Sequence, residues 1–384
     1  MRHAFFLCAC SLLALGPALA QAPIEASLEP GVPPTNLPAL VKAANRNPPL
    51  AESIVAVAIA GEPENAAEIA GDIVAALPPA SLALFGGRVA AAAARAAPSH
   101  AAAIAGAATE AAAYSAGRTA QPKPGVAISV TTQAALTAAA TAAVREVQAV
   151  LVAVDQNPDA QAAAQIAAAI TEAAVAGAMR GTSAAMWDVA RGAGAGPDEA
   201  TTLGDEAARL AAVTVTRGAI EAALLAEGQA AGSDMGQAHA VAEAAPDAAA
   251  QRGAATVLAV ASGVTKAAVA ASLALAKDQK IGAPILVASN ITDAAVAETE
   301  QATTSAAANA AIHAGAPAAD AERLGSAAAA PVSDQIGQVA AEATLTAFAA
   351  LPLPDIIAAA RARGMGPILA NAIATVSAAQ QVQQ

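Results

Sequence analysis

Cysteine is nearly absent from this chain of 384 residues, because its two copies, Cys8 and Cys10, both lie within the first ten positions. Beyond them the chain has no thiol for a disulfide, a metal thiolate or nucleophilic catalysis. This excludes several classes of enzyme and metal-binding domain for the remainder of the chain.

Aromatic residues are also scarce, at 2% of the chain, with one Trp, one Tyr and four Phe. A core must therefore be built from Ala, Val, Ile and Leu, and alanine alone accounts for about one residue in three. Alanine has the highest helix propensity and loses no side-chain entropy on folding. The composition predicts an all-α, alanine-rich fold.

Positive charge is in short supply, and the formal net charge is −12. A chain of this charge repels the phosphates of nucleic acid and anionic lipid surfaces, so we expect no nucleic-acid partner. Mean hydropathy is positive, but alanine carries it. Neither of the most apolar stretches, 127–144 and 257–276, has the roughly twenty strongly apolar residues of a membrane span. We therefore expect no transmembrane span after the leader.

Residues 1–20 have the pattern of a signal peptide. Arg2 and His3 precede the apolar run Ala4 to Leu15, and Ala18-Leu19-Ala20 is a small-x-small cleavage site. The pattern predicts an exported protein, periplasmic or extracellular. In the alternative, Cys10 would be the lipid-modified residue of a lipoprotein, but its preceding apolar stretch would be very short, so we favour cleavage after Ala20.

Residues 21–47 are rich in proline, which favours an extended, disordered linker. From Pro48 onward the prolines are spaced along stretches of helical pattern. Pro48, Pro63, Pro78 and Pro98 are each followed by β-branched or leucine residues six and eleven positions later: Ile54 and Ile59, Ile69 and Val74, Leu84 and Val89, Ile104 and Thr109. This shared register predicts a region of short helical repeats over 48–120.

The second unit shows why such a helix would pack. At 100° per residue, its apolar positions fall within an arc of about 140°. They are Ala66, Ile69, Ala70, Ile73, Val74 and Leu77, whereas Glu64, Glu68 and Asp72 lie outside the arc. Such helices would stack antiparallel, as in an irregular α-solenoid or helical bundle. A low-complexity segment with only nascent helix is the alternative.

The remainder of the chain is expected to form two further helical blocks, 121–196 and 197–378, and a frayed tail, 379–384. Proline-acid pairs indicate helix starts at Pro158, Pro197, Pro246 and Pro354, with weaker signals at Pro317 and Pro331. The sequences QPKPG, at 121–125, and GAGAGP, at 192–197, are natural breaks. Clusters of β-branched residues at 126–130, 213–216 and 285–288 could form short extended pieces.

Chemically versatile side chains are few beyond the leader, where the histidines are His100, His239 and His313. His239 and Glu243 are four residues apart and would share a helix face, a spacing that can hold a metal, but no third ligand lies nearby. We interpret them as a solvated pair. The glycines of GAGAGP lack the preceding strand and the lysine of a phosphate-binding loop, and we expect a helix stop.

Two further features are candidate sites. Trp187, the single tryptophan, lies near Met179 and Met186 at helical spacing, which favours a core position over a binding role. The acidic pairs Asp205-Glu206 and Glu298/Glu300 are typical of exposed helix faces. The sequence thus nominates no catalytic, cofactor-binding or metal site and predicts no cofactor.

The leading hypothesis is an exported, non-enzymatic repeat protein that acts as a scaffold or protein-interaction module of the cell envelope. Its partner could be another protein or a second copy of itself, and the acidic surface favours basic or divalent-cation-bearing partners. The alternative is a periplasmic carrier that binds a small apolar ligand between helices.

Overall fold

The computed structural model describes residues 36–118, 160–233, 245–278, 284–348, 358, 361 and 364–382. These residues form helices and turns and contain no strand, so the all-α prediction is confirmed. Predictions that fall on the signal peptide, on 121–125, 126–130, Pro158, Pro354, His239 or Glu243 lie outside the described residues.

The amino-terminal part consists of short helices. They are α3 (Leu37–Arg46), α4 (Ala51–Gly61), α5 (Ala66–Ala76), α6 (Pro79–Ala96) and α7 (Ala101–Arg118), with single 3-10 turns at Pro48–Leu50, Pro63–Asn65 and Pro98–His100. Helix α3 corrects the expectation of an extended linker up to residue 47. The Asn36 side chain caps it by accepting a hydrogen bond from the Ala39 N–H, and Pro38 stands in the first turn, where no N–H partner is lost.

The predicted packing face of the second unit is confirmed by burial. Its six apolar positions, from Ala66 to Leu77, are buried, and Glu64, Glu68 and Asp72 are exposed. The third unit, which follows Pro78, departs from the predicted register. Leu84, expected on the packing face, is 59% exposed, and Leu82 is buried instead. Here Pro78 precedes the helix in an extended conformation and α6 begins at Pro79 without a 3-10 turn, which changes the residues that face the core.

The remainder of the chain is built mainly from long helices. They are α9 (Ala160–Gly192), α10 (Pro197–Ser233), α12 (Pro246–Asp278) and α13 (Pro284–His313), followed by the shorter α14 (Ala318–Ala329), α15 (Val332–Ala347) and α17 (Pro367–Val382). The prediction of short helices is therefore wrong for this part, because a helix without internal proline continues through isolated glycines. The stretches 213–216 and 285–288 are helical, not extended, and the tail is helical to Val382.

The predicted helix boundaries are more successful. Helices begin at Pro197 and Pro246, and directly after Pro317 and Pro331. The break at 192–197 is also present. Gly194 has a φ of +92° just past the end of α9, a conformation that glycine adopts without steric cost. GAGAGP is therefore the predicted helix stop.

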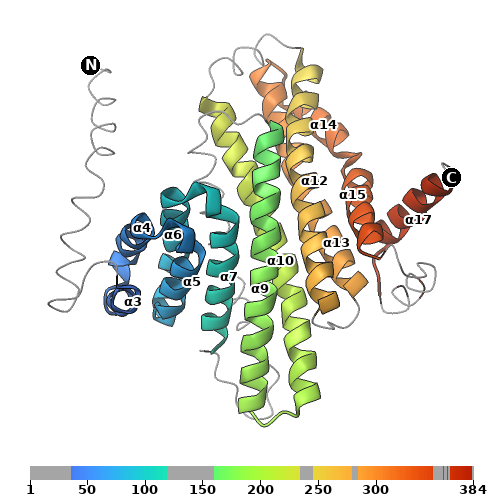
Figure 1. Cartoon of the computed structure of the whole chain (residues 1–384). Helices are drawn as coiled ribbons and strands as arrows, with labels where there is room; N and C mark the ends of the chain where they lie inside the picture. Colours follow the sequence, from blue (N-terminus) through green and yellow to red (C-terminus); the bar gives the residue numbers. More distant parts are fainter. Residues whose placement is uncertain are drawn as a thin grey trace, which may run out of the picture.

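Figure 1 shows the short helices α3 to α7 on one side of the long helices α9, α10, α12 and α13, with α14, α15 and α17 on the other. Helices α7 and α9 are parallel neighbours: Gly106 meets Gly177, and Glu110 meets Gly181. The expected antiparallel arrangement is therefore wrong for this pair. It holds for α9 and α10, where Gly204 lies against Ser183 across the turn.

One core joins these layers, extending from Leu40 to Ile373. It is dominated by alanine and branched aliphatic residues, and it also contains buried threonines. Six of the buried threonines donate their hydroxyl to the carbonyl four residues earlier in their own helix, whereas the hydroxyls of Thr182, Thr299 and Thr303 have no partner in the described part of the chain. The six are Thr109, Thr171, Thr216, Thr265, Thr292 and Thr344. This local bond satisfies the hydroxyl without a partner helix, so a threonine fits a narrow gap between closely packed helices.

Helix α12 is long and apolar enough, over Pro246–Leu275, to cross a membrane by length and composition. In the fold it packs against α9, α10, α13, α14 and α15, and 56% of its most apolar window is buried. The core helix of a globular bundle meets the same criteria of length and hydropathy.

Candidate functional site

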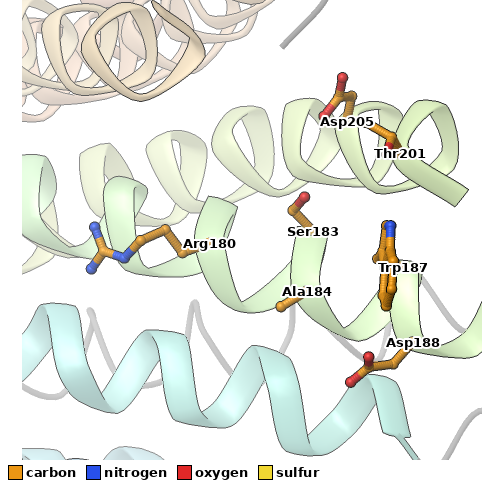
Figure 2. A pocket seen from close by; sticks show the side chains of 7 residues that line it. All are labelled: Arg180, Ser183, Ala184, Trp187, Asp188, Thr201 and Asp205. Carbon is orange, nitrogen blue, oxygen red and sulfur yellow. The ribbon is translucent and has the colours of Figure 1, made fainter. Parts of the chain in front are cut away.

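The candidate site is an open groove of about 360 Å³ between α9 and α10, close to the turn that joins them. Figure 2 shows the side chains that line it. Helix α9 contributes Arg180, Ser183, Ala184, Trp187 and Asp188, and α10 contributes Thr201 and Asp205.

The close approach of the two helices fixes the groove's shape. Gly204 of α10 faces the backbone of Ser183, and a Cβ at Gly204 would lie 3.0 Å from the Ser183 carbonyl oxygen. Glycine therefore brings α10 nearer to α9 than a larger residue would allow. The groove is consequently built on two helices held at a fixed spacing, which positions side chains more precisely than a loop does.

Trp187 is 41% exposed, so the prediction that it lies in the core is wrong. Met179 and Met186 are buried. They are seven residues apart and share one face of α9, whereas Trp187 lies about 100° around the helix from Met186. Its ring stands at the edge of the core, and in Figure 2 the nitrogen end of the indole points toward α10.

Four contacts hold the α9 side of the groove. The Arg180 guanidinium pairs with Glu110 of α7, with Nη2 at 2.7 Å and Nε at 2.9 Å from Oε2. The Tyr114 hydroxyl of α7 donates to Asp188 Oδ2 at 2.8 Å. Arg191 lies over the Trp187 ring at 5.7 Å and donates Nη1–H to the Ala195 carbonyl at 2.8 Å.

Two carboxylates line the groove, one from each helix. Glu110 neutralises Arg180, but Tyr114 is a neutral donor and leaves the negative charge on Asp188. Asp205 adds a second carboxylate from α10. A carboxylate offers about four acceptor positions, so one hydrogen bond leaves room for others. The groove thus combines an exposed aromatic ring with two carboxylates.

The other candidate residues of the sequence lie elsewhere in the structure. His100 is 3.8 Å from Glu64, and His313 is exposed in the last turn of α13. Glu298 pairs with Arg217 at 2.8 Å, and Glu300 is exposed. Within the described ranges, no three His, Cys, Asp or Glu residues come together as a metal site would require.

Sequence reasoning missed the groove because it treated its residues separately. The helical spacing of Trp187 with the two methionines favours the core, and Asp205 resembles the many other surface acids of the chain. The available signal was the sequence WDVAR, at 187–191, in which an acid and an arginine follow the one tryptophan within a helical turn. It lies next to a helix stop and a glycine-containing second helix, which together predict a hairpin.

A second polar cluster attaches α17 to α13. The Gly366 N–H donates to Ser289 Oγ at 2.8 Å, and a Cβ at Gly366 would lie 2.5 Å from Asp293 Oδ2. Burial raises the pKa of the Asp293 carboxyl above its usual value. The carboxylate faces the first residues of α17, where the N-terminal dipole favours negative charge. We interpret this cluster as a structural attachment of the carboxy-terminal helix.

No family model, no curated protein and no solved structure matches the chain.

Proposed function

We propose that this chain is a non-enzymatic helical interaction protein that binds a protein partner through the Trp187 groove. The observation that carries the proposal is the exposure of the single tryptophan, in a chain poor in aromatic residues, within a groove held by residues of three helices. Tryptophan is enriched at the energetic centres of protein interfaces, because it offers a large, rigid and amphipathic surface.

The rigid surroundings of the groove support this proposal. Arg180 and Asp188 are tied to α7, and Gly204 fixes the spacing of α10. A preorganised surface loses less side-chain freedom when a partner binds, so more of the interaction energy contributes to affinity. We do not extend the proposal to a carrier of apolar ligands, since the groove is open and lined by charged residues.

We further propose that the protein is exported through residues 1–20 and acts in the cell envelope. The signal-peptide pattern supports this part. Sequencing the amino terminus of protein purified from its native cells tests it: a chain that begins at Gln21 is expected, and a chain that retains Met1 would contradict export by cleavage.

We also propose that 48–116 descends from a degenerate helical repeat. The 3-10 turns that begin at Pro48, Pro63 and Pro98 support a shared unit, as does the burial of the positions six residues after each of these prolines. Repeat arrays commonly present extended binding surfaces. Within this part, α5 and α6 pack against α7 and would support it, and α7 in turn holds the α9 side of the groove.

Site-specific photo-crosslinking in the native cell tests the partner hypothesis. A photoreactive residue replaces Ala184, which lines the groove, and in a matched control it replaces Ala297, an exposed alanine of α13. We expect a defined protein adduct from position 184 that is absent from position 297 and is lost when Trp187→Ala is added. Equal adducts from both positions, or none from 184, would refute a partner at this groove.

A further inference from the structure

We infer that the Trp187 groove receives an extended, proline-rich segment of the partner protein in the polyproline II conformation. This inference rests on the proposed function and specifies the chemistry of the partner. Three properties of the groove carry it: neutral hydrogen-bond donors without partners, charged groups that are already engaged, and the exposed surface of an indole ring.

Two neutral hydrogen-bond donors of the groove have no partner among the described residues. They are the Trp187 indole N–H and the Ser183 hydroxyl, and in Figure 2 both polar ends point toward α10. The two residues are four apart, so they are neighbours on one face of α9. An indole N–H at an interface usually finds an acceptor. The groove therefore suits a ligand that supplies hydrogen-bond acceptors.

The charged groups around the groove are already engaged. Arg180 pairs with a glutamate of α7, and Asp188 accepts a hydrogen bond from a tyrosine of the same helix. Asp205 has an interaction of its own, and the positive charge of Arg191 lies over the indole ring. Charges of both signs thus stand at the groove, and a charged ligand of either sign would meet a like charge. An uncharged ligand avoids this repulsion and displaces none of these contacts.

The apolar surface of the groove suits the ring of proline. Trp187 is 41% exposed, and Ala184, which also lines the groove, is exposed. Proline-rich segments bind in grooves lined by aromatic residues, where their side chains pack against the rings. The Arg191 guanidinium, 5.7 Å from the centre of the indole ring, already occupies its cation-π position. The remaining exposed ring surface is therefore left for apolar contact.

A polyproline II segment also supplies the acceptors that the two donors require. It has no internal hydrogen bonds, so its carbonyl groups are available to a partner. The carbonyls of an α-helix are used within the helix, and an added β-strand requires the edge of a sheet, which α9 and α10 do not provide. Polyproline II is therefore the regular conformation that combines available carbonyls with apolar rings.

The shape of the groove favours a segment of a larger chain over a free small molecule. Its volume of about 360 Å³ is at the low end for ligand pockets, and the groove is open. A few side chains of an extended segment can enter it while the backbone runs over α9 and α10. Proline has a fixed φ before binding, so such a segment loses little conformational freedom in a shallow site.

A peptide titration tests the inference with the full-length protein. The probe is a dye-labelled peptide of nine prolines, and the comparison peptide of nine residues alternates glycine and serine, which is also uncharged but flexible and without rings. We expect saturable binding of the proline peptide in fluorescence anisotropy, with a blue shift of Trp187 emission, and at least about tenfold weaker binding of the comparison peptide. The affinity should change less than about twofold between low and high salt, because no charges are paired.

Two pairs of variants localise the binding. Trp187→Ala removes the ring and its N–H and should weaken binding at least about thirtyfold, whereas Leu210→Ala, which truncates an exposed apolar residue of α10, should change it less than about twofold. Ser183→Ala removes a hydroxyl of the groove and should weaken binding about threefold to tenfold. Ser326→Ala removes an exposed hydroxyl of α14 and should leave binding unchanged.

Equal binding of the two peptides, a steep dependence on salt, or equal effects of Ser183→Ala and Ser326→Ala would overturn the inference. These results are independent of the crosslinking experiment. A groove-dependent adduct without selectivity for proline would retain the proposed function and reject a polyproline II segment as the ligand. Proline-selective, salt-independent binding that requires Trp187 and Ser183 supports the inference directly.

Discussion

Gly177 of α9 lies directly against the backbone carbonyl of Gly106 of α7, so closely that a Cβ at position 177 would overlap the Gly106 oxygen. Gly181, one turn further along α9, meets the Glu110 carbonyl in the same way. Small residues four apart allow two helix backbones to approach closely, as in other small-xxx-small contacts. This contact brings Glu110 and Tyr114 within reach of Arg180 and Asp188, and it therefore positions one wall of the groove.

We expect Gly177→Ala to destabilise the protein by about 1–3 kcal/mol, because the new methyl group must push two backbones apart. Gly192→Ala is the control, since a Cβ at that position meets nothing within 4 Å. Its effect should be neutral or slightly stabilising, because alanine has the higher helix propensity. Urea denaturation followed by circular dichroism measures both. Equal effects would show that α7 and α9 are not packed this closely.

The shifted register of α6 gives a second prediction. Leu82→Ala should cost about 2–5 kcal/mol, because it opens a cavity in the core. Leu84→Ala should cost less than about 0.5 kcal/mol, because this side chain is 59% exposed. The same denaturation experiment compares them. If Leu84→Ala proved the more costly, α6 would follow the proline register predicted from the sequence and not the one found in the structure.

The packing face of α5 leads to a third prediction. Ile69→Asp introduces a carboxylate at a position that is 3% exposed, and we expect a loss of several kcal/mol or failure to fold. Glu68→Ala, on the exposed side of the same helix, should change the free energy of unfolding by less than about 0.5 kcal/mol. Thermal melts followed by circular dichroism provide the comparison. Similar melting temperatures for the two variants would contradict the assigned face.

The Asp293 carboxyl predicts a dependence on pH. Burial raises its pKa in the folded protein, so the folded state holds this proton more tightly than the unfolded chain does. Its contribution to stability is therefore fully present below the ordinary aspartate pKa and is lost as the pH rises through the folded value. Asp293→Asn cannot ionise. The stability of the wild type relative to this variant should fall as the pH rises from about 3 toward neutrality.

Chemical denaturation of both proteins across this pH range measures the difference between their free energies of unfolding. The other carboxylates are the same in both proteins, so their contributions cancel in this difference. A difference that stays constant, or that grows with pH, would show that Asp293 is not held in a partly buried site beside α17.

The local features of the chain could be predicted from its sequence, because they depend on neighbouring residues. Prolines mark the starts of α10 and α12, and the alternation of Ile69 and Ile73 with Glu68 and Asp72 gives the buried face of α5. The sequence also contains the helix stop at Gly194, since glycine is the residue that tolerates a positive φ after a helix.

The arrangement of helices could not be predicted in the same way. Nothing local shows that α7 and α9 are parallel, because that contact joins Gly106 to Gly177 across a long stretch of sequence. The groove depends on this contact, and so do the partners of Arg180 and Asp188. The position of Trp187 illustrates the difficulty. The scarcity of large side chains favours burial of the indole, yet Trp187 is 41% exposed next to the buried Met186.

Acrylamide quenching of the single tryptophan tests most directly whether a groove with an exposed indole exists. Trp187 is the chain's sole tryptophan, so its emission reports on this position alone. We predict red-shifted emission from the folded protein and steep quenching by acrylamide, because the indole is 41% exposed. Blue-shifted emission that acrylamide scarcely quenches in the free folded protein would place Trp187 in the core and contradict the account.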